Sequence, residues 1–253
     1  MEYNMITKTK PRPWTKQDIA DLKDLKEKGY KNQTIAFILE RSEVSIQIKW
    51  KRLHKKDNTY NKEHQLKKYE VNKEFIDIIE PSSVLDLYAG KKPYYLELIK
   101  ELNDLNENLF KTVVTNDKEK EYTINNYNDD ALKVLCKLYY ENNKFDLIDL
   151  DPFGSAYECF DLAIKMAKKG LIITYGEMGH KRWKRLDYVE RFYNINTLEE
   201  FTVDKMIAKT QEIGIQNKKA LIPIFVKEWR NIARVYYEVN TITLNPWKKD
   251  NDI

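Results

Sequence analysis

The stretch FDLIDLDPFGSA, from Phe145 to Ala156, indicates both the fold and the chemistry of this chain. Phe145 to Leu150 predict a buried strand. Asp151 follows at the carboxyl end of that strand, Pro152 cannot continue a β-ladder, and Gly154 permits a sharp turn. Because ligands of open α/β sheets bind beyond the carboxyl ends of the strands, we expect a functional site here.

An acid, a proline and an aromatic ring at a strand tip suit the methylation of an exocyclic amine on a base. Such an amine is a poor nucleophile, because its lone pair is delocalised into the ring. Asp151 and a nearby backbone carbonyl can accept its two hydrogens, and Phe153 can stack on an extruded base. We therefore take Asp151, Pro152, Phe153 and Gly154 as the candidate catalytic residues. The alternative is a carboxylate that only caps a tight turn.

Two further stretches predict strand ends at the same edge of the sheet. The sequence SVLDLYAG, from Ser83 to Gly90, reads as a strand that ends in a carboxylate and a glycine, which allows close approach of a ligand. Thr112 to Thr115 predict the next strand, and an acid after it, Asp117, is placed to grip a ribose. Asp130 opens a helix, either as a contact for an adenine amino group or as an N-cap.

The segment NDDALKVLCKLYYENNKFDLIDLDPFGSAYECFDLAIKMAKKGLIITYGEMG, residues 128–179, resembles the core of the tRNA guanine-N2 dimethyltransferases. The resemblance implies a class I methyltransferase fold, Rossmann-like α/β with helices on both faces of the sheet, and S-adenosylmethionine as the cofactor. It implies that Asp86 and Gly90 line the methionine part of the cofactor, Asp117 its ribose and Asp130 its adenine, while Asp151 to Phe153 hold the target amine. The candidate cofactor-binding residues are Asp86, Tyr88, Gly90, Asp117, Asp130 and Ala131.

The chain also departs from that family. Lys91, Lys92 and Pro93 follow Gly90, without the second glycine of the usual cofactor loop, and Tyr175-Gly176-Glu177 stand where the family has an acidic turn. We expect this chain to lack the family's longer N-terminal region and its C-terminal tRNA-handling domain.

Residues 14–56 predict three short helices that resemble a Myb/SANT or homeodomain-like helix-turn-helix module. Thr15 is a candidate N-cap with Asp18 at capping-box distance, and Ser42 caps a third helix that runs through Leu53. Ile46, Trp50 and Leu53 share its buried face. On another face Ser45, Lys49 and Arg52 are candidate nucleic-acid contacts. The alternative is a helical bundle with a solvated basic face.

The last third of the chain predicts a helix-rich insertion over residues 180–214, followed by two strands, residues 220–226 and 232–239, that close the sheet as an antiparallel pair. Its basic cluster gives four more candidate nucleic-acid contacts: Lys181, Arg182, Lys184 and Arg185. A solvated helix face is the alternative.

Composition bounds the remaining possibilities. The 253 residues contain 44 Lys and Arg, 40 Asp and Glu, three histidines and two cysteines, a composition that argues against a disulfide framework and a structural zinc site. We see no signal peptide or membrane span, so we expect a cytoplasmic protein without a metal or a membrane partner. We expect a flexible tail (1–13), the helix-turn-helix domain (14–56), a linker (57–72) and the methyltransferase domain (73–253).

These observations predict a methyltransferase that modifies an exocyclic amino group of a nucleic-acid base. We expect DNA rather than tRNA as the partner, because the added module resembles a duplex reader and the family's tRNA-handling parts have no counterpart. The alternatives are guanine-N2 methylation of tRNA, and an inactive methyltransferase fold that serves as a DNA-binding regulator or scaffold.

Overall fold

The structure is a computed structural model that describes residues 12–53, 60–103, 110–182, 184, 186–229 and 231–243. The side chains of 60–65, 102, 103 and 182 are outside this description. The chain divides into two compact units, Met1–Lys67 and Lys68–Ile253, which we describe separately.

The first unit contains three helices at the predicted positions: α1 (Lys16–Glu27), α2 (Asn32–Ile38) and α3 (Glu43–Leu53). Thr15 and Asp18 form the expected capping box, in which each side chain accepts from the other residue's backbone N–H at 2.9–3.0 Å. The Oγ of Ser42 accepts from the N–H of Ser45 at 3.2 Å at the start of α3. The buried core of the unit consists of Leu22, Ile35, Leu39 and Ile46.

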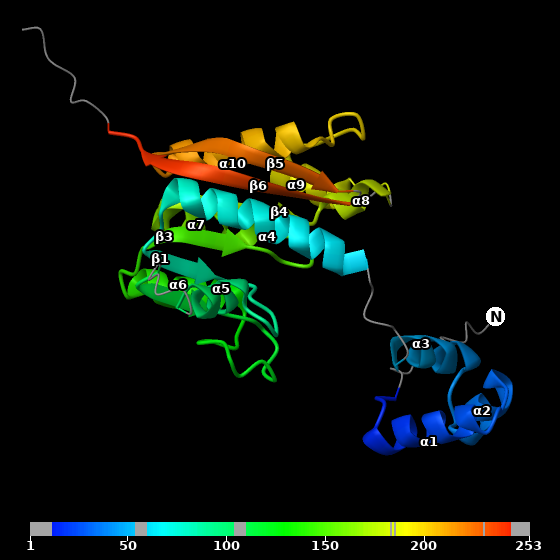
Figure 1. The fold of residues 1–253 in the computed structure, drawn as a ribbon. Coiled ribbons are helices and arrows are strands. Elements are labelled where there is room, and N and C mark those ends of the chain that lie inside the picture. Colours follow the sequence, from blue (N-terminus) through cyan, green and yellow to red (C-terminus); the bar gives the residue numbers. More distant parts are fainter. Residues whose placement is uncertain are drawn as a thin grey trace, which may run out of the picture. The chain divides into compact units, whose positions relative to one another are not determined.

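The second unit is a six-stranded sheet covered by helices (Figure 1). Its strands are β1 (Ser83–Asp86), β2 (Thr112–Thr115), β3 (Phe145–Leu150), β4 (Ala167–Tyr175), β5 (Lys219–Trp229) and β6 (Ile232–Thr241). Its helices are α4 (Tyr60–Ile79), α5 (Tyr94–Asn103), α6 (Ala131–Tyr140), α7 (Phe160–Met166), α8 (Met178–Arg182), α9 (Asp187–Tyr193) and α10 (Val203–Gln216), with a short 3₁₀ turn, η1, at Tyr157–Cys159.

The sheet has the order β2-β1-β3-β4-β6-β5. The first four strands in this order are parallel, and β6 pairs antiparallel with both β4 and β5. This mixed sheet confirms the Rossmann-like α/β prediction and the closing antiparallel pair. The two strands of that pair, β5 and β6, are longer than the sequence indicated.

The sheet separates two apolar clusters, because successive side chains of a strand point to opposite faces. In β1, Val84 packs with α4 and α5, whereas Leu85 packs with α6, α7, α9 and α10. In β3, Leu147 belongs to the same cluster as Val84, and Ile148 belongs to the same cluster as Leu85. Both faces of the parallel strands are therefore covered, which explains why β3 is buried along its whole length.

The predicted linker, residues 57–72, differs from the structure. From Tyr60 onward it belongs to α4, which continues to Ile79, while residues 57–59 lie outside the described residues. The helix persists because its later turns place Phe75, Ile76 and Ile79 against the sheet.

The predicted tail, residues 1–13, is described only at Arg12 and Pro13. Arg12 and Pro13 are tied to the first unit, since their carbonyl oxygens accept from Arg41 at 2.7 Å each.

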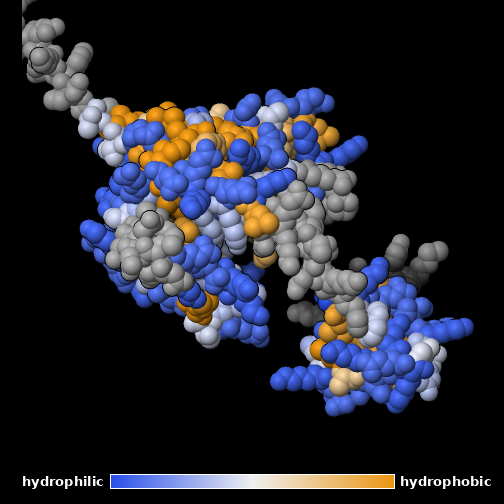
Figure 2. Space-filling view, in the orientation of Figure 1, coloured by the Kyte–Doolittle hydropathy of each residue, from blue (hydrophilic) through white to orange (hydrophobic). Residues whose placement is uncertain are grey.

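Figure 2 shows hydrophobic side chains gathered over β5 and β6, where Ile222, Val226 and Ile232 are exposed. None of the described helices has the length and apolar content needed to cross a membrane.

Candidate active site

The carboxyl ends of β1, β2 and β3 bring three predicted acids to one edge of the sheet. Asp86 ends β1, where it lies in register with Thr115 of β2 and Asp149 of β3. Asp117 follows β2 by two residues and Asp151 follows β3 directly. The sequence-predicted cofactor and target residues therefore converge, as the rule for open α/β sheets requires.

The loop after β1 contacts the loop after β2. The N–H of Gly90 donates to Asp117 Oδ2 at 3.0 Å, and Gly90 has a φ of +69°, which favours glycine. A Cβ added to Gly90 would meet no atom within 4 Å, so this backbone faces open space. A ligand can approach the loop closely there, despite the missing second glycine.

Asp86 is buried, and its Oδ1 accepts from the N–H of Tyr88 at 3.2 Å. Burial and the neighbouring charge of Asp149 raise the pKa of Asp86 well above its usual value. Tyr88 is half-buried, with its hydroxyl 3.7 Å from Sγ of Cys159. This end of β1 therefore favours the binding of a positively charged ligand group.

Asp130 caps α6, because its Oδ1 accepts from the N–H groups of Leu132 and Lys133 at 3.1 and 3.2 Å. The capping alternative is therefore correct for this oxygen, whereas a contact with adenine stays a prediction. Ala131, the first residue of α6, is buried.

Asp151 accepts donors from three separate elements. Its Oδ1 accepts from Thr174 Oγ1 of β4 at 2.7 Å and lies 3.3 Å from Nη1 of Arg234 of β6. Its Oδ2 pairs with the ammonium of Lys68 of α4. Burial opposes ionisation of Asp151, but the charges of Lys68 and Arg234 outweigh it and hold the pKa of this carboxyl below its usual range.

The three residues that contact Asp151 were not predicted from the sequence. Lys68 fell within the expected linker, and Thr174 and Arg234 lie in strands that the sequence reasoning used only for the fold. One signal was available: Asp149 and Arg234 each interrupt an apolar strand, and buried charges are normally paired.

The loop after β3 presents Phe153 to solvent, with its side chain fully exposed, while Pro152 is half-buried. This loop packs against the turn after β4. A Cβ on Gly176 would lie 2.2 Å from the carbonyl oxygen of Gly154. The loop that carries the candidate residues Pro152 and Phe153 therefore depends on a glycine at the Tyr175-Gly176-Glu177 turn.

The candidate nucleic-acid contacts of α3 differ in exposure. Ser45 and Lys49 are half-buried, and Lys49 Nζ lies 5.5 Å from the centroid of the Trp14 ring, so this cation already has an aromatic partner. Arg52 is exposed. Ile48, which shares the predicted face, and Lys51 are exposed as well.

In the second basic cluster, Lys181 Nζ donates to the carbonyl oxygen of Phe201 at 2.9 Å, and Lys184 is exposed. Arg182 ends α8, but its side chain lies outside the described residues, as does Arg185 entirely. The described residues contain no group of His, Cys, Asp or Glu side chains that could hold a metal ion.

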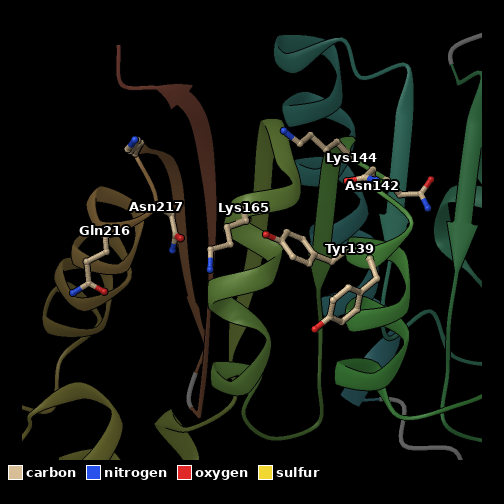
Figure 3. Close-up of a pocket in the computed structure, with 9 residues that line it drawn as sticks. Tyr139, Asn142, Lys144, Lys165, Gln216 and Asn217 are labelled. Carbon is tan, nitrogen blue, oxygen red and sulfur yellow. The ribbon is translucent and has the colours of Figure 1, made fainter. Parts of the chain in front are cut away.

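A surface pocket of about 540 Å³ lies at the opposite edge of the sheet (Figure 3). It is lined by Tyr139, Lys144, Lys165 and Asn217, which lie near the ends of α6, α7 and α10 and the beginning of β3. It is thus separate from the edge that carries Asp151.

The sequence profile of a family described as N2,N2-dimethylguanosine tRNA methyltransferase matches residues 94–245, more than half of the chain. This chain belongs to that family. A tRNA (guanine(26)-N(2))-dimethyltransferase from Methanocorpusculum labreanum is 31% identical over 103 residues, which cover 38% of this chain and 26% of that relative.

Among solved structures, Trm1 from Pyrococcus horikoshii in complex with S-adenosyl-L-methionine has a TM-score of 0.53 and 17% identity, over 66% of this chain and 53% of that one. At this identity the likeness establishes a shared methyltransferase fold. The chain spans about a quarter of the curated relative's length and about half of the solved one's.

The comparisons favour the alternative partner, tRNA, over DNA. The sequence reasoning preferred DNA, but the matching family and the curated relative are both described as tRNA methyltransferases. That preference relied on the helical unit, which lies outside the matched residues 94–245, and on the expected lack of the family's tRNA-handling parts.

Proposed function

We propose that this chain is an S-adenosylmethionine-dependent methyltransferase that modifies N2 of guanine in tRNA. The observation that carries this proposal is Asp151 at the tip of β3, held by Thr174, Arg234 and Lys68. It lies at the same sheet edge as Asp86 and Asp117, in a chain of the N2,N2-dimethylguanosine tRNA methyltransferase family. An acid there can accept a hydrogen from an amino group that approaches over the sheet edge.

The residues present fit the cofactor. S-Adenosylmethionine supplies an electrophilic methyl group on a sulfonium, together with a cationic ammonium group. Asp86 is a buried acid beside Asp149, and a cationic group that binds there would lower its raised pKa and favour its charged form. The open space above Gly90 leaves room for the methionine part. Asp117 stands at the tip of β2, where a ribose is commonly held.

The remaining cofactor contacts follow from position. Tyr88 lies in the same loop as Gly90, between Asp86 and the open backbone. Asp130 and Ala131 begin α6 at the same edge, and Asp130 uses only Oδ1 for capping in its recorded hydrogen bonds. We propose that Asp130 and Ala131 border the adenine.

The chain's own residues then prepare the amine. The exposed ring of Phe153 stacks on the extruded guanine and fixes its plane. An oxygen of Asp151 accepts one N2–H, which directs the nitrogen lone pair toward the methyl group. Methyl transfer would break the S–CH₃ bond of the donor as the N–CH₃ bond forms. The proton would leave the nitrogen for water afterwards, so Asp151 need not act as a strong base.

The role of the first unit is a further part of the proposal. Arg52 and Lys51 are exposed on α3, where they can contact RNA phosphates. The more specific Myb/SANT-like assignment, with Ser45 and Lys49 as contacts, stays a prediction. Lys181, Lys184, Arg182 and Arg185 stay candidate contacts near α8.

The decisive experiment incubates the purified full chain with labelled S-adenosylmethionine and either tRNA or duplex DNA. Digestion of the RNA to nucleosides should identify N2-methylguanosine or N2,N2-dimethylguanosine. The control Asp151→Asn keeps the shape of the side chain but removes its charge, and should lower the rate by about 10²-fold or more. Label in DNA alone, or on a ring nitrogen of the base, would contradict the proposal.

Binding of the cofactor is measured separately by calorimetry. The wild-type protein should bind S-adenosylmethionine, and Asp86→Asn should weaken binding by removing charge at the end of β1. A wild-type protein without cofactor binding would support the inactive-scaffold alternative instead.

A further inference from the structure

The carboxylate of Asp151 is held unequally at its two oxygens. Oδ1 contacts Thr174 and Arg234, which are 4% and 1% exposed. Oδ2 contacts the ammonium of Lys68, which lies at the end of a long flexible side chain that is 23% exposed. Oδ1 is therefore fixed by the core, and Oδ2 by a group that can move aside.

Arg234 is itself immobilised by four neighbours. Its Nη2 donates to Asp149 Oδ2 at 2.6 Å and to Asn72 Oδ1 at 3.3 Å, and its Nε donates to the hydroxyl of Tyr236 at 3.1 Å. Its Nη1 donates to Thr174 Oγ1 at 2.6 Å. These contacts hold the planar guanidinium in one orientation.

The hydroxyl of Thr174 then has a defined direction. It carries one hydrogen, and its oxygen already accepts from Arg234. Its own hydrogen must therefore point to the remaining partner, Asp151 Oδ1, at 2.7 Å. The chain Arg234–Thr174–Asp151 is a directed relay of hydrogen bonds that begins in the core and ends at the candidate catalytic oxygen.

We infer that Thr174, oriented by Arg234, is a positioning residue that fixes Asp151 so that Oδ2 faces the target amine once Lys68 moves aside. The inference rests on the proposed methyltransferase function and deepens it. It assigns the two carboxylate oxygens different tasks: Oδ1 anchors the group, and Oδ2 accepts the N2–H. Lys68 occupies the acceptor oxygen and keeps it ionised before the substrate arrives.

The alternative is that Thr174 only satisfies two buried polar groups. Thr174→Val and Thr174→Ser separate the two interpretations, because valine has nearly the shape of threonine without the hydroxyl, whereas serine keeps the hydroxyl. We expect Thr174→Val to lower kcat by about 10- to 100-fold, since a misaligned catalytic group costs up to about 10² in rate. Thr174→Ser should recover most of kcat, and the Kd for S-adenosylmethionine should stay within about twofold.

The matched control is Thr210→Val. Thr210 is also fully buried, and its hydroxyl contacts the hydroxyl of Tyr175 at 2.7 Å and the carbonyl of Met206 at 2.9 Å, with no recorded bond to Asp151. It should lose stability as Thr174→Val does, while kcat stays near the wild-type value. Equal losses of kcat in the two valine variants, or an unchanged kcat in Thr174→Val, would overturn the inference.

The pH profile gives a second readout. Loss of the Thr174 donor should raise the pKa of Asp151, so the acidic limb of the kcat profile should move to higher pH in Thr174→Val and return in Thr174→Ser. NMR titration of ¹³C-labelled aspartate carboxyls should show the same shift for Asp151 without any substrate. An unshifted Asp151 titration contradicts the relay, whereas a wild-type protein that methylates no tRNA contradicts the proposed function.

Discussion

Gly176 packs directly against Gly154: a Cβ on Gly176 would lie 2.2 Å from the carbonyl oxygen of Gly154 and 2.9 Å from its carbonyl carbon. Because the obstructing atoms belong to the backbone, no side-chain rotation can relieve the contact. The turn after β4 thus sets the position of the loop that carries Phe153.

Gly176→Ala should therefore destabilise the protein by about 1–3 kcal/mol, the usual cost of overpacking, and displace the loop after β3. Urea denaturation measures this as a lower midpoint. Gly154→Ala is the matched control, because its Cβ would meet no atom within 4 Å. Its free energy of unfolding should change by no more than about 0.5 kcal/mol, and equal losses in the two variants would refute this account.

Phe153→Ala should leave stability unchanged, since the ring is fully exposed and buries no area in the fold. Stacking of a base on an aromatic ring contributes about 1–3 kcal/mol. The substitution should thus lower kcat/KM for tRNA by roughly 10- to 100-fold, and Phe153→Tyr should restore it. If Phe153→Ala methylated tRNA at the wild-type rate, the ring would have no part in holding the base.

Arg234→Met should destabilise the second unit strongly, by about 3–5 kcal/mol, because it leaves the buried Asp149 without its cation. The double variant Arg234→Met, Asp149→Leu should recover much of this loss, since no buried charge then lacks a partner. A double-mutant cycle of unfolding free energies measures the coupling. Additive losses would show that the two side chains do not depend on each other.

Acid should weaken the first unit. The backbone N–H of Thr15 and the guanidinium of Arg41 hold the pKa of Asp18 at about 2, below its usual value of 3.8. A lowered pKa in the folded state stabilises the unit above pH 4, and this contribution disappears as the pH falls through about 2.

Hydrogen-exchange protection factors of α1, followed from pH 6 to pH 2, measure that loss. Asp18→Asn should give lower protection at neutral pH and little further change over this range. Protection in the wild-type protein that stays constant down to pH 2 would show that the capping box and Arg41 add nothing to the unit's stability.

Local patterns were enough to predict much of this fold. The bounds of β3, the capping box at Thr15 and the acids beyond β1 and β2 follow from a few adjacent residues. The rule that places ligands beyond parallel strands then brought Asp86, Asp117 and Asp151 together without any knowledge of the tertiary structure.

Contacts between distant residues were not predictable in this way. Lys68 and Arg234 are separated from Asp151 by 83 residues in each direction, so no local spacing connects them. An arginine in a strand ordinarily points to solvent. Arg234 does not, because β6 lies between β4 and β5 and both of its faces are covered. Lys49 likewise looked free for nucleic acid until the fold placed it near Trp14.

The position of β6 inside the sheet has a consequence for biogenesis. The ribosome releases Asp149 long before Arg234, which lies 85 residues later. Until Arg234 has been synthesised and has taken its place in β6, the buried Asp149 lacks its cation, and Asp151 has only Thr174 and Lys68 as partners. The acid beyond β3 therefore gains its full set of contacts only when β6 joins the sheet beside β4.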